Sequence, residues 1–230
     1  MATVLDVVSG ALRLIGVYSS GQVLPSHELN DAISSLNQML GSWSTSIQLQ
    51  NTTQENFTLT ASQATYTWGT GANFNSARPS RVIQAWVRVS GVDYPMVPDS
   101  KFDYNEEGLK TNTGIPTLFA VDNAYPNANV KLYPAPDSGY TIYFESVKPF
   151  TSYSSGSTTV SLPPAYIRAM RYALAIELAP EYGVQPPEAV IKNAQSAVNS
   201  LKRNNMQQPV AKFDLPMASG SGSSFDYRRG

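Results

Sequence analysis

The hydrophobic period of this chain changes twice along its 230 residues. Near both ends, apolar residues recur every three or four positions, as they do along one face of a helix. From about residue 47 they recur at every second position, the spacing of half-buried strands, and near residue 163 the helical spacing returns. This order predicts an α+β protein with helices at both ends and strands between them.

The N-terminal region has the pattern of two helices. The first, from Thr3 to about Val17, begins with Thr3 and Asp6 in the spacing of a capping box. Ser26 is placed to cap the second helix, which continues to about Trp43. We expect the two helices to form an antiparallel hairpin. Their apolar stripes are Val4, Leu5, Val8, Leu12 and Ile15, and then Leu29, Ile33, Leu36, Met39, Leu40 and Trp43.

The middle of the chain predicts a β-meander. Residues 81–89 alternate in polarity, and Ser90-Gly91 is suited to a two-residue turn into the strand that follows. The polar segment 99–107 is predicted to hold one or two helical turns, and the Ser/Thr-rich segment 151–159 to be a surface loop or a hairpin tip. Further strands are predicted at residues 56–60, 65–68, 92–94, 116–122, 129–133 and 140–146.

Two more helices are predicted after this loop. Pro163-Pro164 opens the first, because a proline at the first helical position gives up no hydrogen bond, and Pro180 with Gly183 should end it. Pro186-Pro187 opens the second, which should end near Lys202 and Arg203. Their apolar stripes are Ile167, Met170, Leu174 and Leu178, and then Val190 or Ile191, Ala194, Ala197, Val198 and Leu201.

We expect the two terminal helix pairs to form one split α-helical bundle. An antiparallel β-rich domain would be inserted into this bundle, and an extended C-terminal tail would follow it. The expected divisions are an N-terminal helix pair at 1–48, a β-rich insert at 49–160, a C-terminal helix pair at 161–204 and a tail at 205–230.

Composition excludes several classes of function. The chain has no cysteine, which excludes disulfides, thiolate nucleophiles and cysteine-bound zinc or iron–sulfur sites. Its net charge of -1 lacks the basic excess that holds a nucleic-acid backbone, so we expect no direct binding of duplex DNA. Neither a secretory signal nor an apolar run of membrane-spanning length is present, so we expect a soluble protein.

No arrangement of residues indicates catalysis. The single histidine, His27, is expected to be a solvated or capping residue in the first turn of its helix. The sequence has no G-x-S-x-G elbow and no glycine-rich phosphate loop. One carboxylate cluster, formed by Asp103, Glu106 and Glu107, leaves open a carboxylate-dependent cell-wall hydrolase. The main expectation is a protein without enzymatic activity, metal or cofactor.

Low charge and abundant tyrosine fit a protein with extensive protein contacts. Only 14% of the residues are charged, against roughly 25% in an ordinary soluble domain, and 13 are tyrosine. Charged residues are depleted from interface cores and tyrosine is enriched there. The same composition also fits a polar, loop-rich protein.

The C-terminal residues 205–230 are too rich in serine and glycine to supply a packed core. Such a segment can become ordered on a partner, or it can simply be a disordered terminus. Its spaced apolar residues favour a docking role, and they are Phe213, Leu215, Met217, Phe225 and Tyr227.

Several short motifs follow one another in the second half of the chain. In this order they resemble the head-to-tail adaptor family of tailed bacteriophages, also called tail accessory or packaged-DNA-stabilisation proteins. The likeness covers nearly the whole chain. The motifs are Gly114-Ile115-Pro116-Thr117-Leu118-Phe119, Val130-Lys131-Leu132-Tyr133-Pro134-Ala135-Pro136-Asp137, Tyr140-Thr141-Ile142-Tyr143-Phe144, Leu162-Pro163-Pro164-Ala165-Tyr166 and Leu178-Ala179-Pro180-Glu181-Tyr182-Gly183.

The resemblance implies a structural subunit that assembles as a ring, typically dodecameric, on the portal protein. The ring would close and extend the DNA channel, through which packaged DNA passes without sequence-specific binding, and would receive the next tail or nozzle protein. Such a protein assembles in the host cytoplasm and resides in the neck of the virion. Another phage neck or tail structural protein is the alternative.

The resemblance also implies that the C-terminal tail docks on the portal. Its two arginines would then pair with acidic groups there. The residues of this expected arm are Phe213, Leu215, Pro216, Met217, Phe225, Tyr227, Arg228 and Arg229.

Overall fold

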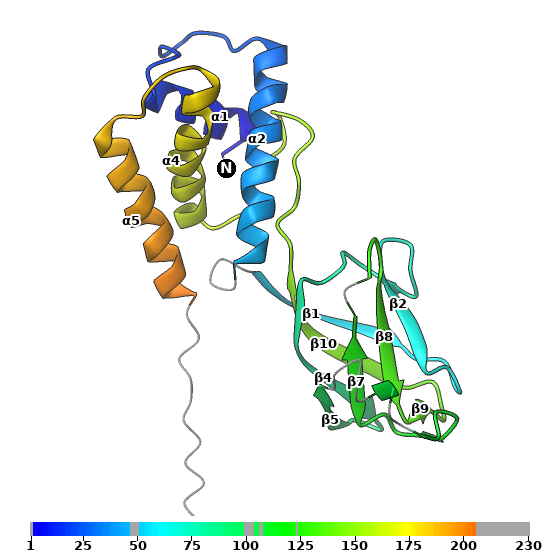
Figure 1. Cartoon of the computed structure of the whole chain (residues 1–230). Coiled ribbons are helices and arrows are strands. Elements are labelled where there is room, and N and C mark those ends of the chain that lie inside the picture. The colour runs from blue at the N-terminus through cyan, green and yellow to red at the C-terminus, as the bar shows by residue number, and fades with distance from the viewer. Residues whose placement is uncertain (1, 47–50, 99–103, 106–107, 123, 206–230) are drawn as a thin grey trace, which may run out of the picture.

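The computed structural model describes residues 2–46, 51–98, 104–105, 108–122 and 124–205. Long helices lie at the two ends of this part of the chain, and the strands lie between them in sequence (Figure 1). The helices are α1 (Val4–Leu14), α2 (Ser26–Thr45), α4 (Pro164–Glu181) and α5 (Glu188–Asn204).

The two N-terminal helices begin in different ways. In α1 the Thr3 hydroxyl accepts from the Asp6 N–H at 3.2 Å, and the Asp6 carboxylate accepts from the Thr3 N–H at 2.8 Å. This confirms the predicted capping box. The predicted Ser26 cap is wrong, because Pro25 is the N-cap residue and its carbonyl accepts from the Leu29 N–H, which makes Ser26 the first helical residue.

Helix α4 is the common partner of the other three helices, each of which contacts it. Its buried face combines Met170, Leu174 and Leu178 with alanines, whose small side chains let neighbouring helices approach closely. The helix runs through Pro180 to Glu181 before the chain turns. Around α4 lies a core of mainly aliphatic residues that extends from Val4 to Val190.

The strands form one large sheet and one small one. In the large sheet the order is β1-β10-β4-β5-β7-β8-β2-β3, and β6 pairs with β9 in the small one. The pairs β2–β3 and β5–β7 are parallel, and the remaining pairs of the large sheet are antiparallel. The strands are β1 (Asn51–Thr58), β2 (Thr65–Gly69), β3 (Phe74–Asn75), β4 (Arg81–Val89), β5 (Val92–Pro98), β6 (Thr113–Gly114), β7 (Leu118–Val121), β8 (Ala128–Tyr133), β9 (Ala135–Pro136) and β10 (Thr141–Lys148).

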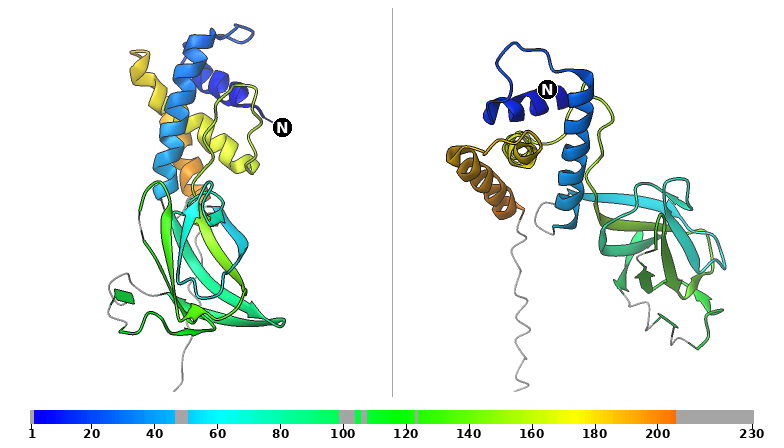
Figure 2. Two further views of the ribbon diagram at one scale, coloured as in Figure 1. Left: turned by 90° about the vertical axis from the view of Figure 1, so that its right-hand side faces the viewer. Right: turned by 45° about the horizontal axis from the view of Figure 1, so that its top comes forward.

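The large sheet curls round a core of aromatic side chains below the helices (Figure 2). Its two edge strands meet through this core, because Phe57 of β1 stacks on Phe74 of β3 with ring centroids 4.6 Å apart. Trp68 and Phe144 are fully buried beside them. The sheet is therefore nearly closed.

An ion pair between the buried Lys148 and the half-buried Glu55 lies along the seam between the two edges of the sheet. Lys148 Nζ is 2.6 Å from the Glu55 carboxylate, donates to Ser76 Oγ at 3.0 Å and lies over the Trp68 ring. Ser76 Oγ donates to Glu55 at 3.1 Å, and Trp68 Nε1 donates to Ser76 Oγ at 2.8 Å. Burial, partly offset by Glu55, lowers the pKa of Lys148. The network joins β1, β2 and β10 with the residue that follows β3.

The predicted fold class is wrong. The expectation was a split bundle of terminal helix pairs with an inserted antiparallel domain, whereas the chain is dominated by a mixed, nearly closed sheet of 8 strands. The first two helices do not form the expected hairpin either, since α1 runs across α2 and packs chiefly on α4 (Figure 2). Hydrophobic periodicity identifies an apolar stripe but not the surface that it contacts. The division at residues 48, 160 and 204 stays a prediction.

Candidate assembly interface

The predicted docking arm starts where the described residues end. Helix α5 ends at Asn204, and the side-chain amide of Asn205 donates to the Tyr166 hydroxyl of α4. Leu201, one turn earlier, is buried in a small core with residues of α4. The root of the arm is thus fixed against the helices. The predicted arm residues all lie outside the described residues, and they are Phe213, Leu215, Pro216, Met217, Phe225, Tyr227, Arg228 and Arg229.

The groups considered for catalysis do not form a described site. Asp103, Glu106 and Glu107 lie outside the described residues. His27 is the second residue of α2, and its side chain is 77% exposed beside Glu28. Within the described part of the chain, no group of three or more His, Cys, Asp or Glu residues could hold a metal ion.

The outer face of the large sheet carries an aromatic platform formed by Trp86, Arg88, Asp93 and Tyr143. Trp86 of β4 stacks on Tyr143 of β10 with centroids 5.5 Å apart, and the Arg88 guanidinium lies over the same tyrosine at 4.5 Å. Arg88 also forms a bidentate pair with Asp93 of β5, and this pair lowers the pKa of the Asp93 carboxyl. The Trp86 Nε1 atom is buried without a hydrogen-bond partner. Flat aromatic and guanidinium surfaces of this kind are enriched in protein interfaces.

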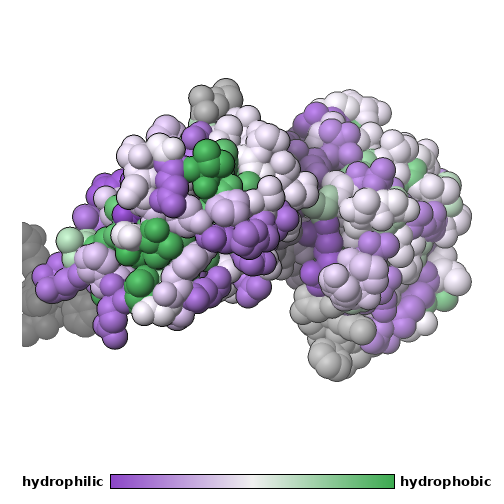
Figure 3. Space-filling model, turned by 90° about the horizontal axis from the view of Figure 1, so that it is seen from above, coloured by the Kyte–Doolittle hydropathy of each residue, from purple (hydrophilic) through white to green (hydrophobic). Residues whose placement is uncertain are grey.

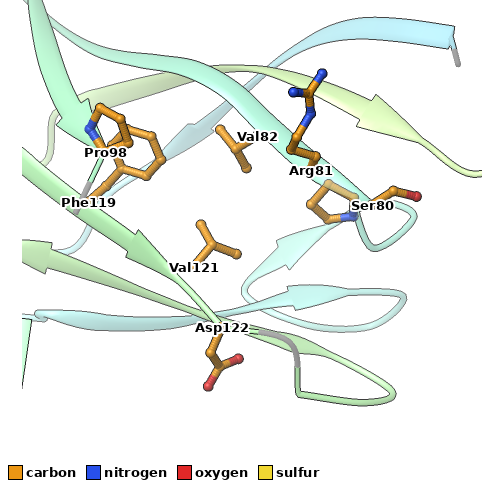
Figure 4. A pocket seen from close by; sticks show the side chains of 8 residues that line it. Ser80, Arg81, Val82, Pro98, Phe119, Val121 and Asp122 are labelled. Atoms are coloured by element: carbon orange, nitrogen blue, oxygen red, sulfur yellow. The ribbon is translucent and has the colours of Figure 1, made fainter. Parts of the chain in front are cut away.

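A slot opens in the sheet between the start of β4 and the end of β7 (Figure 4). It is a hollow of about 220 Å³ lined by Val82 of β4, Pro98 of β5, and Phe119 and Val121 of β7. Arg81 lies at its rim, and its side chain is exposed. The slot thus combines an apolar floor with a charged rim.

At the far end of the helical part, two loops are tied to one carboxylate. The Tyr18 hydroxyl, between α1 and α2, donates to Glu28 at 2.7 Å, and the Tyr182 hydroxyl, after α4, donates to it at 3.1 Å. Burial, with help from Glu28, raises the pKa of Tyr182 to about 12. Hydrophobic side chains gather on the helical part when the molecule is seen from this end, whereas the sheet shows a more polar surface (Figure 3).

Comparison with known families identifies the class of protein. A family model described as SU10 adaptor protein matches residues 3–213, which include every described helix and strand. The chain belongs to this family of phage head-to-tail adaptors. No curated protein matches the chain. The adaptor family is structural rather than enzymatic, and membership makes the chain a structural component of a phage virion.

Family membership confirms the resemblance deduced from the motifs of the second half. An adaptor must contact other head and tail components, and such contacts need extended protein surfaces. None of the described helices is long and apolar enough to cross a membrane. The matched span runs past the last described residue of α5 and ends at Phe213, within the expected arm.

The platform and the slot were not predicted from the sequence. A signal for the platform exists, because the alternation of β4 that buries Ala85 and Val87 places Trp86 and Arg88 on the opposite face. A half-buried tryptophan next to an exposed arginine on the outer face of a strand is typical of a protein interface, because both residue types are enriched there. No local signal predicts the slot, because it lies where β5 changes partner from β4 to β7, which are far apart in the sequence.

Proposed function

We propose that this adaptor assembles as a dodecameric ring beneath the portal of a tailed phage. The ring closes and extends the DNA channel, and its far face receives the downstream tail or nozzle protein. The observation that carries this proposal is the family match over residues 3–213. Packaged DNA passes through the channel without sequence-specific binding, in keeping with a net charge of -1.

A closed ring needs two different, complementary faces on each subunit. The low charge of the chain, 14% of residues, and the aromatic platform on the sheet favour such contacts. Assembly takes place in the host cytoplasm, and the mature ring resides in the neck of the virion.

The C-terminal arm docks on the portal in this proposal. Its root is held by the contact of Asn205 with Tyr166, so the following residues leave every subunit from an equivalent point of the ring. Twelve arms acting together bind far more tightly than one. Arg228 and Arg229 pair with acidic groups of the portal.

Mass photometry and negative-stain imaging of the full chain mixed with purified portal test this function. We expect saturable decoration at one copy per portal subunit. The variant Arg228→Glu with Arg229→Glu should bind more weakly, by roughly tenfold or more at low salt, because two attractive charges become repulsive. Arg203→Glu, an exposed charge reversal on α5, is the matched control and should bind as the native chain does. Native-strength portal binding by a chain lacking residues 206–230 would refute the docking arm, and no portal binding by the full chain would refute the adaptor ring.

A further inference from the structure

The slot lies where β5 changes partner. It pairs with β4 from Val92 to Met96, whereas its last two residues, Val97 and Pro98, pair with β7. Among the described residues, β4 from Arg81 to Gln84 then pairs with β10 alone. Two strand segments therefore face each other across a gap, each with one side unpaired within the described part of the chain.

The β7 side of the gap is equally open. Leu118 and Phe119 pair with β5, but Ala120 and Val121 pair with β8 alone within the described sheet. Neighbouring strands lie about 4.8 Å apart, so an extended segment between β4 and β7 would have hydrogen-bonding backbone on both sides. A segment that continued the line of β5 would be antiparallel to β4 and parallel to β7.

The side chains of the slot define what such a segment must carry. Phe119, which is 3% exposed, and the half-buried Val82 and Val121 form an apolar floor on the core side. Arg81 supplies a positive charge at the rim, and the nearby Asp122 carboxylate already accepts from two backbone N–H groups. Because side chains alternate along a strand, the segment should present two apolar residues inward with an acidic residue between them facing Arg81.

The tail of this chain contains that pattern. Phe213-Asp214-Leu215 has two apolar residues two positions apart, with a carboxylate between them. The tail leaves α5 after Asn205, and the seven residues from 206 to 212 can span up to about 24 Å. The family match reaches Phe213, so the start of this segment lies within the part of the chain common to the family.

We propose that Phe213-Asp214-Leu215 of a second copy adds as a short strand in the slot between β4 and β7. Phe213 and Leu215 cover the apolar floor, and Asp214 pairs with Arg81. This inference rests on the proposed ring, which supplies the second copy, and it gives the ring a contact in which arm and slot are the two complementary faces. It also narrows the portal contact to the later part of the arm, around Phe225 and Tyr227.

Disulfide trapping tests the proposal directly, because the chain has no cysteine of its own. Full-length Val121→Cys and full-length Leu215→Cys chains are mixed, oxidised, and analysed without reductant, with and without portal. A strand in the slot brings the two Cα atoms within the roughly 7 Å that a disulfide requires, so covalent dimers should form in the mixture. The matched control pairs Leu215→Cys with Val23→Cys, whose position is 86% exposed on the helical part, and should give none.

Each result of this experiment either supports or overturns the proposal. Equal crosslinking with the Val23 control, or none with and without portal, would overturn the proposal. A chain carrying both Val121→Cys and Leu215→Cys should form a ladder of covalent oligomers, and a faster-migrating monomer instead would show that the arm closes on its own subunit. If Val121→Cys unfolds, Val82→Cys on the opposite wall takes its place.

Exchanging the charges of the proposed pair distinguishes a specific strand in the slot from nonspecific crosslinking. Arg81→Glu should reduce the yield of covalent dimer several-fold, and adding Asp214→Arg to the partner should restore it, because the pair is rebuilt with reversed signs. No restoration would contradict the pairing. Portal binding is measured separately. Covalent dimers without portal binding would contradict the proposed function alone, and portal binding without covalent dimers would contradict this inference alone.

Discussion

The helical part and the sheet of this adaptor bury their interiors with different kinds of side chain. The helical core consists mainly of Val, Leu, Ile, Met and Ala, spread along α1, α2 and α4. The sheet core is centred on aromatic rings that come from strands far apart in the sequence, from Phe57 to Phe144. Helical stability is thus divided among many moderate contacts, whereas the sheet depends on a few large ones.

The largest effect should come from removing the central ring of the sheet. Phe144 is fully buried and touches the rings of Phe57, Trp68, Phe74 and Phe119. Phe144→Ala should lower the free energy of unfolding by about 3–5 kcal/mol, because it removes an aromatic ring and leaves a cavity. Urea denaturation followed by tryptophan fluorescence measures this loss.

The adjacent residue supplies the control for this prediction. Tyr143 lies on the outer face, and Tyr143→Ala should cost no more than about 1.5 kcal/mol, since it removes the stack on Trp86 and the contact with Arg88 but no part of the core. Equal losses from the two substitutions would show that the aromatic core does not carry the stability of the sheet.

The second largest loss of stability should come from disrupting the ion pair at the seam of the sheet. Glu55→Gln leaves the Lys148 ammonium, whose side chain is 10% exposed, without its counter-charge, and should cost about 2–4 kcal/mol. Adding Lys148→Met removes the unpaired charge and should recover part of the loss. Urea denaturation of the two variants measures both steps, and a double variant less stable than Glu55→Gln alone would contradict this account.

The two regions also differ in how far they could be predicted from sequence. The helices could be located from local signals: the Thr3–Asp6 capping box and the apolar stripe ending at Leu201 lie within or beside α1 and α5 as the structure has them. The hairpin through Ser90 and Gly91 is another local feature, and both residues have the positive φ that its tight turn requires.

The arrangement of the sheet could not be predicted in this way. The parallel pair β5–β7 and the pair β1–β10 join strands that are far apart in the sequence. An apolar residue at every second position indicates which face of a strand is buried, but it does not indicate which strand lies alongside. The burial of Lys148 and the pairing of the start of β4 with β10 alone among the described residues depend on that order. The expected fold class failed for this reason, whereas the family could still be deduced from the order of short motifs.

The smallest effect should come from the polar contact that fastens the helical loops, the counterpart of the ion pair in the sheet. Tyr182→Phe removes one of two hydroxyl donors to Glu28 and should cost about 0.5–1.5 kcal/mol at neutral pH, because Tyr18 still donates to the same carboxylate. A loss of stability as large as that expected for Glu55→Gln would show that the polar contacts of the two regions do not differ in strength.

The pH dependence of stability gives a second test of the contact between Tyr182 and Glu28. The folded chain raises the pKa of Tyr182 from 10.0 to about 12, so it retains a proton that the unfolded chain loses between these values. Tyr182 therefore makes stability fall as the pH rises from 10 to 12, and has no such effect below pH 10. In Tyr182→Phe the alkaline decline, measured by urea denaturation at several pH values, should be shallower. Some decline should remain, since burial also raises the pKa of Tyr66 and Tyr153. Tyr125→Phe, at a position 90% exposed, should keep the native slope, and an equal change in both variants would mean that the contact with Glu28 is not the cause.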